Sequence, residues 1–453
     1  MIAIIGGGIS GLAAAYELTR RQRPFMLFEA SERLGGLVRT EHVNGFTIEA
    51  GADSMLVQKR AALDLCEELG LAPHLLSMKR PRAAFVLHEG RLHPLPAGSL
   101  LGIPSTWRSL AAYTLLPLGA RARLALEPLI PAATSTEDES IAAFFSRRFG
   151  SATVSRLAQP LLGGIHAGDV HTLSVRALFP RLVEAERSGS VLRWARQTIR
   201  GRRGDGAFRS LPGGMSDLVH AVEQRLPPDA ICRREDVRSI ERRDTAWHLS
   251  TERRTVTAQA VIFACPAYAA GSLLASIDAD AARICGSVPY VSTVSVALAW
   301  PRAAVGHPLE GSGFVVVRGS KDLRLTACTW VSSKWDHRAP AGHVLLRAYL
   351  GGDHDQTAVD LDDREIIDLV VRQLSAILSI TGAPDLARVY RWRQHGAQHT
   401  VGHLARMAEL QRALSRHQGL FVTGSGFRSI GIPDCIADGR SVAVEAGAFA
   451  YDH

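Results

Sequence analysis

The chain begins Met1-Ile2-Ala3-Ile4-Ile5-Gly6-Gly7-Gly8-Ile9-Ser10-Gly11, and this stretch decides its fold. The apolar, β-branched residues before Gly6 predict a buried parallel strand, and the alanine-rich residues after Gly11 predict a helix. Gly6 would permit a tight turn, Gly8 would let backbone amides approach a pyrophosphate, and Gly11 would let helix and strand pack closely. The stretch therefore predicts a dinucleotide-binding fold, with a cofactor loop formed by Gly6, Gly7, Gly8, Ile9, Ser10 and Gly11.

A second short apolar stretch, Pro24 to Phe28, predicts another strand that ends at Glu29 and Ala30. Glu29 stands 18 residues after Gly11, where a carboxylate can accept hydrogen bonds from ribose hydroxyls. The same negative charge would repel a 2′-phosphate, so the sequence disfavours NADP. NAD and FAD both remain open at this point.

The segment Ser31 to Thr40 carries a second glycine pair, Gly35-Gly36, followed by Leu37. Two adjacent glycines allow the backbone to lie against another part of a long ligand, and Arg33 could reach its pyrophosphate. This segment resembles the R-x-G-G motif of the FAD-binding amine-oxidase-like superfamily. The resemblance implies FAD as cofactor.

Three further segments resemble cofactor-binding segments of that superfamily. The first passes beside the flavin ring. The second is a strand-like stretch from Ile231 to Ile240, which clasps the adenine through the backbone of Val237. The third begins with a short apolar strand, Leu420 to Gly424, and leads into a C-terminal helix aimed at the flavin N1–C2=O edge. Asp53 has an alternative interpretation as a helix N-cap, and Cys435 is either a redox thiol or a small packing residue. The residues that the resemblance implies are Gly51, Ala52, Asp53, Ser54, Val237, Gly424, Ile430, Gly431 and Ile432.

We therefore predict an α/β protein in which residues 1–80, 206–275 and 388–453 form a Rossmann-type FAD-binding domain assembled from discontinuous segments. Residues 81–96 and 276–387 predict a substrate domain with a mixed sheet, with strands over 290–300, 314–317 and 345–349 and a helix over 354–382. Residues 97–205 predict a helical subdomain. Its arginines and aromatics beside apolar positions suit either an ordinary core stripe or contact with a membrane surface.

Four more segments indicate one particular family within this superfamily. They lie at 137–150, 160–169, 210–218 and 328–335. With the run from Gly431 to Ile436, they resemble the oxygen-dependent protoporphyrinogen and coproporphyrinogen III oxidases of haem synthesis. The resemblance implies a porphyrinogen substrate that gives hydride to flavin N5, with O₂ as final acceptor and H₂O₂ as product. It also implies that Ala167 and Gly168 line the macrocycle, where a backbone carbonyl could orient the pyrrole N–H groups.

Because aromaticity drives this oxidation, no side chain is assigned as a catalytic base. His166 is either a base or a partly buried histidine with a satisfied hydrogen bond. The propionates of the substrate predict an arginine partner, which we place at Arg82; Ala84 is the alternative position in this register.

The composition limits the kinds of partner that the protein is expected to bind. The 453 residues carry a formal net charge of +8, nearly all of it from arginine, which indicates either compositional bias or an anionic partner. No basic block with interleaved aromatics predicts nucleic-acid binding, and no Cys/His spacing predicts a metal site. Six cysteines without C-x-x-C, an N-terminus without a signal peptide and the lack of an 18-residue apolar run predict a cytoplasmic protein. Peripheral contact with the inner membrane face and transient contact with the next haem-pathway enzyme remain open.

Two other classes of function compete with porphyrinogen oxidation. The first is another flavin oxidase of the superfamily, but an amine oxidase should pair aromatics near the C-terminal motif, where only Phe427 stands. The second is a non-catalytic binder like the GDP-dissociation inhibitors, which would not need the ribose acid and the second glycine pair. The sequence does not separate coproporphyrinogen III from protoporphyrinogen IX.

Overall fold

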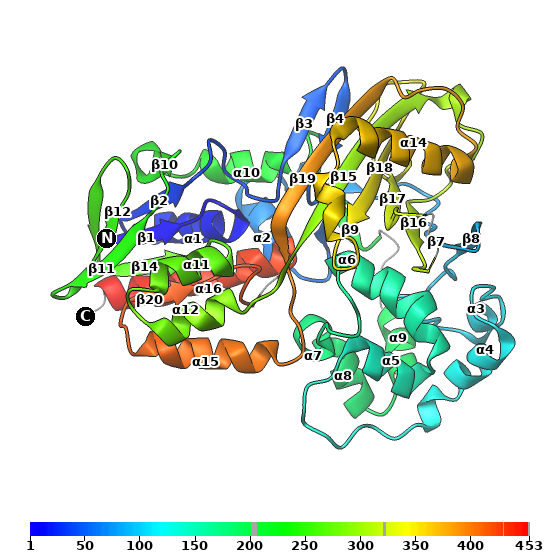
Figure 1. Ribbon diagram of the computed structural model, residues 1–453, viewed down its shortest axis with the longest axis horizontal. Helices are drawn as coiled ribbons and strands as arrows, with labels where there is room; N and C mark the ends of the chain where they lie inside the picture. The colour runs from blue at the N-terminus through cyan, green and yellow to red at the C-terminus, as the bar shows by residue number, and fades with distance from the viewer. Residues whose placement is uncertain (201–205, 320–322, 429, 452–453) are drawn as a thin grey trace.

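Five parallel strands from three distant parts of the chain form one sheet (Figure 1). The computed structural model describes residues 1–200, 206–319, 323–428 and 430–451. The strands predicted at both ends of the chain and in its middle therefore lie side by side, which confirms a Rossmann-type domain of discontinuous segments. The order across the sheet is β10 (Ile231–Arg233), β2 (Phe25–Glu29), β1 (Ile2–Ile5), β14 (Ala260–Phe263) and β20 (Leu420–Val422).

The central strand β1 is buried on both faces. Ile2 and Ile4 belong to one hydrophobic core, and Ala3 and Ile5 belong to another, because successive side chains of a strand point to opposite faces. This explains why β1 is apolar throughout instead of alternating with polar residues. Four helices cover one face of the sheet: α1 (Ile9–Arg20), α2 (Ala61–Glu68), α10 (Ser216–Glu223) and α16 (Ile432–Tyr451). Three helices and a small antiparallel sheet cover the other face. They are α11 (Ala267–Leu274), α12 (Ala279–Gly286), α15 (His403–Ser415) and the strands β11 (Ser239–Arg243), β12 (Ala246–Ser250) and β13 (Thr255–Ala258).

A mixed seven-stranded sheet forms the second part of the molecule. All of its neighbouring strands are antiparallel except β7 and β16, which run parallel. The predicted strands near 290–300, 314–317 and 345–349 are all present in it, and residues 81–96 contribute two strands, as expected. The order is β19 (Leu386–Ala397), β15 (Tyr290–Pro301), β18 (His343–Gly351), β17 (Ala327–Trp330), β16 (Gly313–Val316), β7 (Phe85–His88) and β8 (Arg91–Pro94).

Two predicted boundaries differ from the structure. Residues 388–397 were assigned to the FAD-binding domain, but β19 pairs with β15 and so belongs to the mixed sheet. The helix predicted over 354–382 is shorter, since α14 spans Asp363–Leu378. Its start is set by Asp362, whose carboxylate accepts a hydrogen bond from the backbone N–H of Glu365 at 2.8 Å in a capping box. A separate 3₁₀ turn, Gln356–Asp360, precedes it.

Small β elements join the two sheets. The hairpin of β3 (Thr40–Val43) and β4 (Phe46–Glu49) packs its apolar residues against β15 and β18. The chain then passes through residues 50–54 into a three-stranded sheet of β5 (Met55–Leu56), β9 (Phe208–Ser210) and β6 (Leu76–Ser77). The segment 50–54 consequently lies between the parallel sheet and the mixed sheet.

The predicted helical subdomain is confirmed, although its predicted boundary at residues 201–205 lies outside the described residues. The fully buried Arg148 donates to the Glu127 carboxylate, which also accepts from the Ser190 hydroxyl at 2.6 Å. This buried ion pair ties separate helices together. The helical elements are α3 (Trp107–Ala111), α4 (Leu118–Ala125), α5 (Ile141–Phe149), the π-helix Val154–Gly163, α6 (Gly164–His166), α7 (Val175–Leu178), α8 (Pro180–Arg187) and α9 (Val191–Arg200). Within the described part of the chain, none of the helices combines the length and the apolar character needed to cross a membrane.

Candidate functional site

The glycine turn between β1 and α1 has the geometry that the sequence predicts. Gly6 has φ +108°, and a Cβ there would lie 2.7 Å from the carbonyl oxygen of Ala264. A Cβ on Gly11 would lie 1.9 Å from the Gly6 carbonyl oxygen, so only glycine lets α1 start this close to the strand. A Cβ on Gly8, by contrast, would meet no described atom within 4 Å. Gly8 therefore faces open space, where a pyrophosphate could lie.

The second glycine pair lies directly against this turn. The Gly35 N–H donates to the Gly7 carbonyl at 2.8 Å, and Gly8 and Gly35 form an isolated parallel bridge. Gly36 has φ +57°, and a Cβ there would come within 3.1 Å of the Gly8 Cα. The fold thus brings both predicted cofactor loops to one place.

Glu29 ends β2 beside the same turn. Its carboxylate accepts hydrogen bonds from the backbone N–H groups of Gly7 at 2.8 Å and Ser31 at 2.9 Å. The Glu235 N–H donates to the Glu29 carbonyl at 3.0 Å, which places the predicted adenine segment that contains Val237 next to the predicted ribose acid. The carboxylate is half-buried, so a ligand hydroxyl could reach it.

Arg33 has a role within the loop that the sequence did not predict. Its guanidinium donates to the carbonyls of Gly36 at 2.6 Å and Val38 at 3.3 Å, and it thereby holds the second glycine pair in place. Burial lowers the pKa of Arg33. Contact between Arg33 and a pyrophosphate stays a prediction.

The C-terminal segment closes the site from the other end of the chain. Gly424 follows β20 with φ +108°, and a Cβ there would lie 3.4 Å from the Ser10 Oγ. On α16, Asp438 accepts from the Thr423 hydroxyl at 2.6 Å and the Gly424 N–H at 3.2 Å. The predicted helix start is confirmed at Ile432, directly after Ile430 and Gly431. The two ends of the chain therefore meet at the glycine turn.

Cys435 lies in the first turn of α16 and is buried. Burial raises the pKa of its thiol to about 12, so the thiol stays protonated at neutral pH. This favours the packing interpretation of Cys435 over the redox one.

The segment from Gly51 to Ser54 is fixed by the loop at Leu37 on one side and by residues of the mixed sheet and its connections on the other. A Cβ on Gly51 would lie 1.9 Å from the Leu37 carbonyl oxygen. Asp53 forms an ion pair with Lys334 at 2.7 Å. Burial alone would raise the pKa of Asp53, but the charges of Lys334 and Arg347 hold it well below its usual range. The N-cap interpretation of Asp53 is wrong, because the strand β5 and not a helix follows it.

Lys334 and Arg347 are site residues that the sequence analysis missed. Arg347 donates to the carbonyls of Glu49 at 2.5 Å and Gly51 at 2.9 Å, so the mixed sheet holds the predicted flavin segment directly. Lys334 lies within the family segment 328–335, in which the resemblance implies no role for this lysine. Nothing in the local pattern marks Arg347, since its partners lie almost 300 positions away in the chain.

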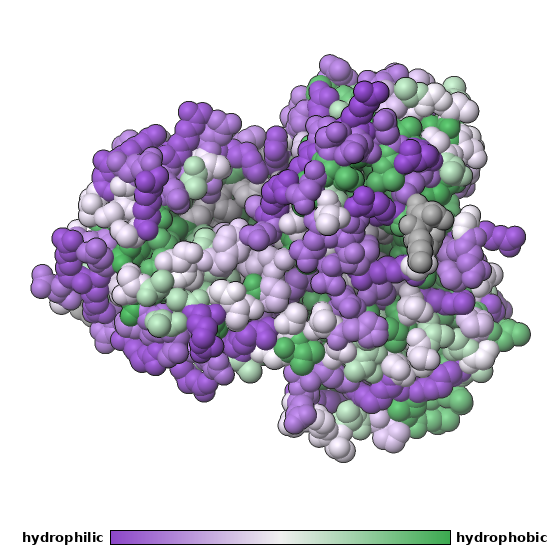
Figure 2. Space-filling model, in the orientation of Figure 1, coloured by the Kyte–Doolittle hydropathy of each residue, from purple (hydrophilic) through white to green (hydrophobic). Residues whose placement is uncertain are grey.

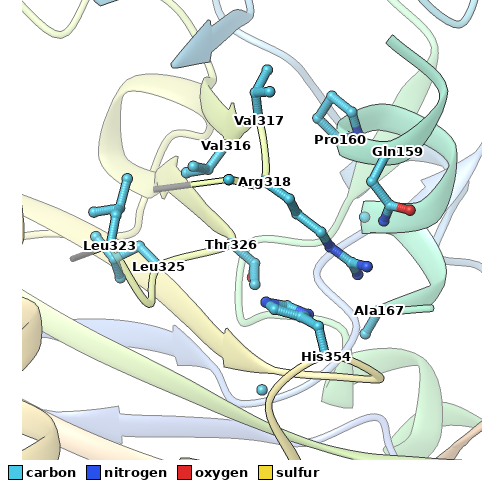
Figure 3. Close-up of a pocket in the computed structure, with 13 residues that line it drawn as sticks. Gln159, Pro160, Ala167, Val316, Val317, Arg318, Leu323, Leu325, Thr326 and His354 are labelled. Atoms are coloured by element: carbon cyan, nitrogen blue, oxygen red, sulfur yellow. The ribbon is translucent and has the colours of Figure 1, made fainter. Parts of the chain in front are cut away.

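The loop Ala167–Gly168 borders a small, partly open cavity between the helical subdomain and the mixed sheet (Figure 3). The Gly168 carbonyl accepts from Gln159 Nε2 and Arg318 Nη2, both at 3.0 Å, and the Ala167 carbonyl accepts from the Asp353 N–H at 2.8 Å. Both carbonyls are thus engaged inside the protein and are poorly placed to orient pyrrole N–H groups. Ala167 itself lines the cavity.

His166 precedes this loop and packs edge-on against Phe179. Burial, together with the nearby His399 and Lys59, lowers the pKa of His166 to about 4. Its Nδ1 is buried without a hydrogen-bond partner among the described residues. A neutral imidazole of such low pKa is a weak base, so the structure gives little support to a catalytic His166.

Arg82 lies just before β7, where its Nε donates to the Met78 carbonyl at 3.2 Å. The Ala83 carbonyl accepts from the Ser312 N–H at 2.7 Å, so Arg82 stands near the start of β16. Ala84, the alternative position, is the residue directly before β7 and has no charge. Binding of a propionate by Arg82 stays a prediction.

The glycine turn, the ribose acid, the second glycine pair and the C-terminal segment together define a dinucleotide-binding flavoprotein. The chain belongs to the family of flavin-containing amine oxidoreductases, whose model matches residues 9–446. Its cofactor is FAD, and the open space before Gly8, bordered by both glycine loops, fits the pyrophosphate of that cofactor.

Two relatives and one solved structure resemble the chain over nearly its whole length. The coproporphyrinogen III oxidase of Bacillus subtilis is 35% identical, covering 99% of this chain and 98% of its own length. That of Staphylococcus aureus is 30% identical and covers 98% of each. A crystal structure of a candidate protoporphyrinogen oxidase from Exiguobacterium sp. 255-15 is 31% identical, with a TM-score of 0.88 and 98% of each chain covered.

Proposed function

We propose that this protein is an FAD-dependent oxidase that converts coproporphyrinogen III to coproporphyrin III in haem biosynthesis. The observation that carries this proposal is the similarity, over nearly the full length, to relatives that bear the name coproporphyrinogen III oxidase. The resemblance of the segments at 137–150, 160–169, 210–218 and 328–335 points the same way. Protoporphyrinogen IX is the alternative substrate.

The overall reaction removes six electrons and six protons from the porphyrinogen and passes them to three O₂, which become three H₂O₂. Bound FAD supplies the two-electron acceptor that O₂ regenerates. The protein must hold the macrocycle beside the cofactor and exclude water. Val316, Val317 and Leu325 give part of the cavity wall an apolar character that suits the edge of an apolar substrate, and Arg347 fixes the segment from which Asp53 projects.

The proposal assigns no proton acceptor among the side chains. Asp53 is held ionised by Lys334 and Arg347, which makes it a weak base, and His166 is neutral with a low pKa. The gain of aromaticity provides the driving force, so pyrrole protons can leave to solvent. Binding geometry is accordingly the main contribution of the protein.

The proposal is tested by supplying the purified yellow protein with coproporphyrinogen III or protoporphyrinogen IX under air. We expect fluorescent porphyrin to form with three H₂O₂ for each porphyrin, and faster from coproporphyrinogen III. Heat-denatured protein serves as the control for spontaneous oxidation. Equal rates with native and denatured protein would refute the proposal, whereas a faster reaction of protoporphyrinogen IX would favour the alternative substrate.

We further propose that the protein works in the cytoplasm and touches the inner face of the membrane through its helical subdomain. Apolar side chains are exposed at the outer part of that subdomain, namely Trp107 (65% exposed), Leu118 (78%), Leu126 and Leu129 (77%). Figure 2 includes green, hydrophobic residues at the edge of this region. Arg108, Arg121 and Arg123 lie on the same short helices and could attract anionic lipids. Release of the product there would allow transient contact with the next haem-pathway enzyme.

A further inference from the structure

Arg318 is a half-buried cation that the proposed chemistry has not used. It follows β16 and reaches into the cavity beside Ala167 (Figure 3). Its Nη2 donates to the Gly168 carbonyl at 3.0 Å, and this is its single hydrogen bond among the described residues. No described carboxylate forms a salt bridge with it, although Asp169 and Asp353 interact with its charge at longer range. The guanidinium therefore retains donors for another group.

The surroundings of Arg318 define the chemistry of that group. The cavity wall combines the apolar side chains of Pro160, Val316, Leu323 and Leu325 with the polar side chains of Gln159, Thr326 and His354, and His354 lies across from the guanidinium (Figure 3). A cation held against apolar surface loses hydration, and an anionic partner offsets this loss. The guanidinium fork matches a carboxylate, which it can bind through two parallel hydrogen bonds. The cavity thus suits an apolar body that carries a carboxylate.

The mixed sheet sets the distance between this cavity and the predicted flavin segment. Gly351 of β18 lines the cavity, while Arg347 of the same strand donates to the Gly51 carbonyl. These two residues lie four positions apart on one face of the strand, which corresponds to about 13 Å. A macrocycle placed beside the flavin segment can therefore extend an acidic side chain to Arg318.

Arg82 and Arg318 stand at opposite ends of one strand pair. The Ser312 N–H donates to the Ala83 carbonyl before β16, and the Val317 N–H donates to the Leu87 carbonyl after it. A ligand held at both ends needs carboxylates on opposite edges. Coproporphyrinogen III carries one on each of its four pyrroles, whereas the two of protoporphyrinogen IX sit on neighbouring pyrroles at one edge.

We propose that Arg318 binds a propionate that only coproporphyrinogen III carries, and thereby makes the enzyme prefer the tetracarboxylate. This inference rests on the proposed function and adds the residue that determines the substrate. In steady-state kinetics, Arg318→Met is expected to lower kcat/KM for coproporphyrinogen III about 10- to 100-fold, mainly through KM, because a charge-assisted hydrogen bond is lost. The value for protoporphyrinogen IX should change less than about threefold.

Two variants separate binding from structure. Arg318→Lys keeps the charge and should recover part of the loss in kcat/KM for coproporphyrinogen III. Arg364→Met removes a positive charge from a side chain that is 92% exposed, and it should leave kcat/KM for both substrates unchanged. Equal losses for the two substrates would overturn the inference, since they would indicate a disturbed Ala167–Gly168 loop. Unchanged kinetics for coproporphyrinogen III would overturn it as well. Failure of the wild type to oxidise either porphyrinogen would instead refute the proposed function.

Discussion

Gly6, Gly8 and Gly11 stand in one turn, yet each is required for a different reason. Added Cβ atoms on Gly6 and Gly11 would collide with the backbone of the protein itself, at 2.7 Å from Ala264 and 1.9 Å from Gly6. Only the Cβ of Gly8 would enter open space. A side chain at Gly8 therefore conflicts with a ligand and not with the fold, which separates binding from folding in an experiment.

Gly8→Val should fold normally and be purified as a colourless protein, because the valine side chain would occupy the place of the pyrophosphate. The flavin absorbance and the melting temperature of the apoprotein check this result. Gly119→Val, at a helix position that also faces open space, should remain yellow. Yellow Gly8→Val protein would show that the cofactor lies elsewhere.

The ion pair of Asp53 and Lys334 is mostly buried, with side-chain exposures of 19% and 13%. Lys334→Met leaves the Asp53 carboxylate without its nearest cation and should reduce the free energy of unfolding by about 3 kcal/mol. The double variant Asp53→Asn/Lys334→Met removes both charges and should regain part of this loss. Urea unfolding of the wild type, Lys334→Met, Asp53→Asn and the double variant measures the coupling energy between the two side chains, and strictly additive losses would show that they do not interact.

At the residue scale, the sequence predicted what depends on local backbone chemistry. The glycine turn, Glu29 and the glycine pair are recognisable because their spacing follows from the strand, turn and helix that carry them. Lys334 and Arg347 were not predictable, because their partners Asp53 and Gly51 are brought to them only by the register of the mixed sheet. The same is true of the bonds from Gln159 and Arg318 to the Gly168 carbonyl, which engage the oxygen that the resemblance had offered to the substrate.

At the element scale, α16 and α1 join the two ends of the chain through a close approach. A Cβ on Gly439 of α16 would lie 2.3 Å from the backbone oxygen of Ser10, whereas a Cβ on Gly447 of the same helix would make only an ordinary contact at 3.8 Å with Leu18. Gly439→Ala should therefore lower the free energy of unfolding by about 1–3 kcal/mol and speed the release of FAD, because the helices must separate at the cofactor turn.

Gly447→Ala is the matched control for this effect. Since alanine favours helix over glycine, its stability should stay equal or rise by up to about 1 kcal/mol. Both variants are compared by urea unfolding and by FAD release on dilution. If Gly439→Ala and Gly447→Ala had the same free energy of unfolding and released FAD at the same rate, the contact of α16 with Ser10 would not support the site.

The predicted elements were most accurate where apolar patterns are strong, as in β1, β2 and β20. The error at β19 has a physical cause: Arg388, Arg391, Arg393 and His395 make this strand too polar to recognise, and it can be so polar because it lies at the edge of the sheet. The early start predicted for α14 has another cause, since the cap at Asp362 excludes the preceding residues from the helix.

At the scale of the whole molecule, the helices α3 and α4, which carry exposed apolar side chains, lie far from the glycine turn between β1 and α1 (Figure 1). Replacing Trp107, Leu118 and Leu129 together by serine should abolish sedimentation with vesicles that contain anionic lipid, without loss of FAD, because these exposed side chains provide the apolar contact. Leu404→Ser, at a 52% exposed leucine of α15, is the control. Wild-type protein that fails to sediment with such vesicles would refute membrane contact.

The two chain ends and the mixed sheet meet at the predicted cofactor site, and the central claim is that a porphyrinogen reduces the FAD bound there. The most direct test is to mix the yellow protein with coproporphyrinogen III in the absence of O₂ and follow the flavin absorbance. We expect the yellow colour to bleach, and to return with H₂O₂ and fluorescent coproporphyrin when air is admitted. A flavin that stays oxidised under these conditions would contradict the account.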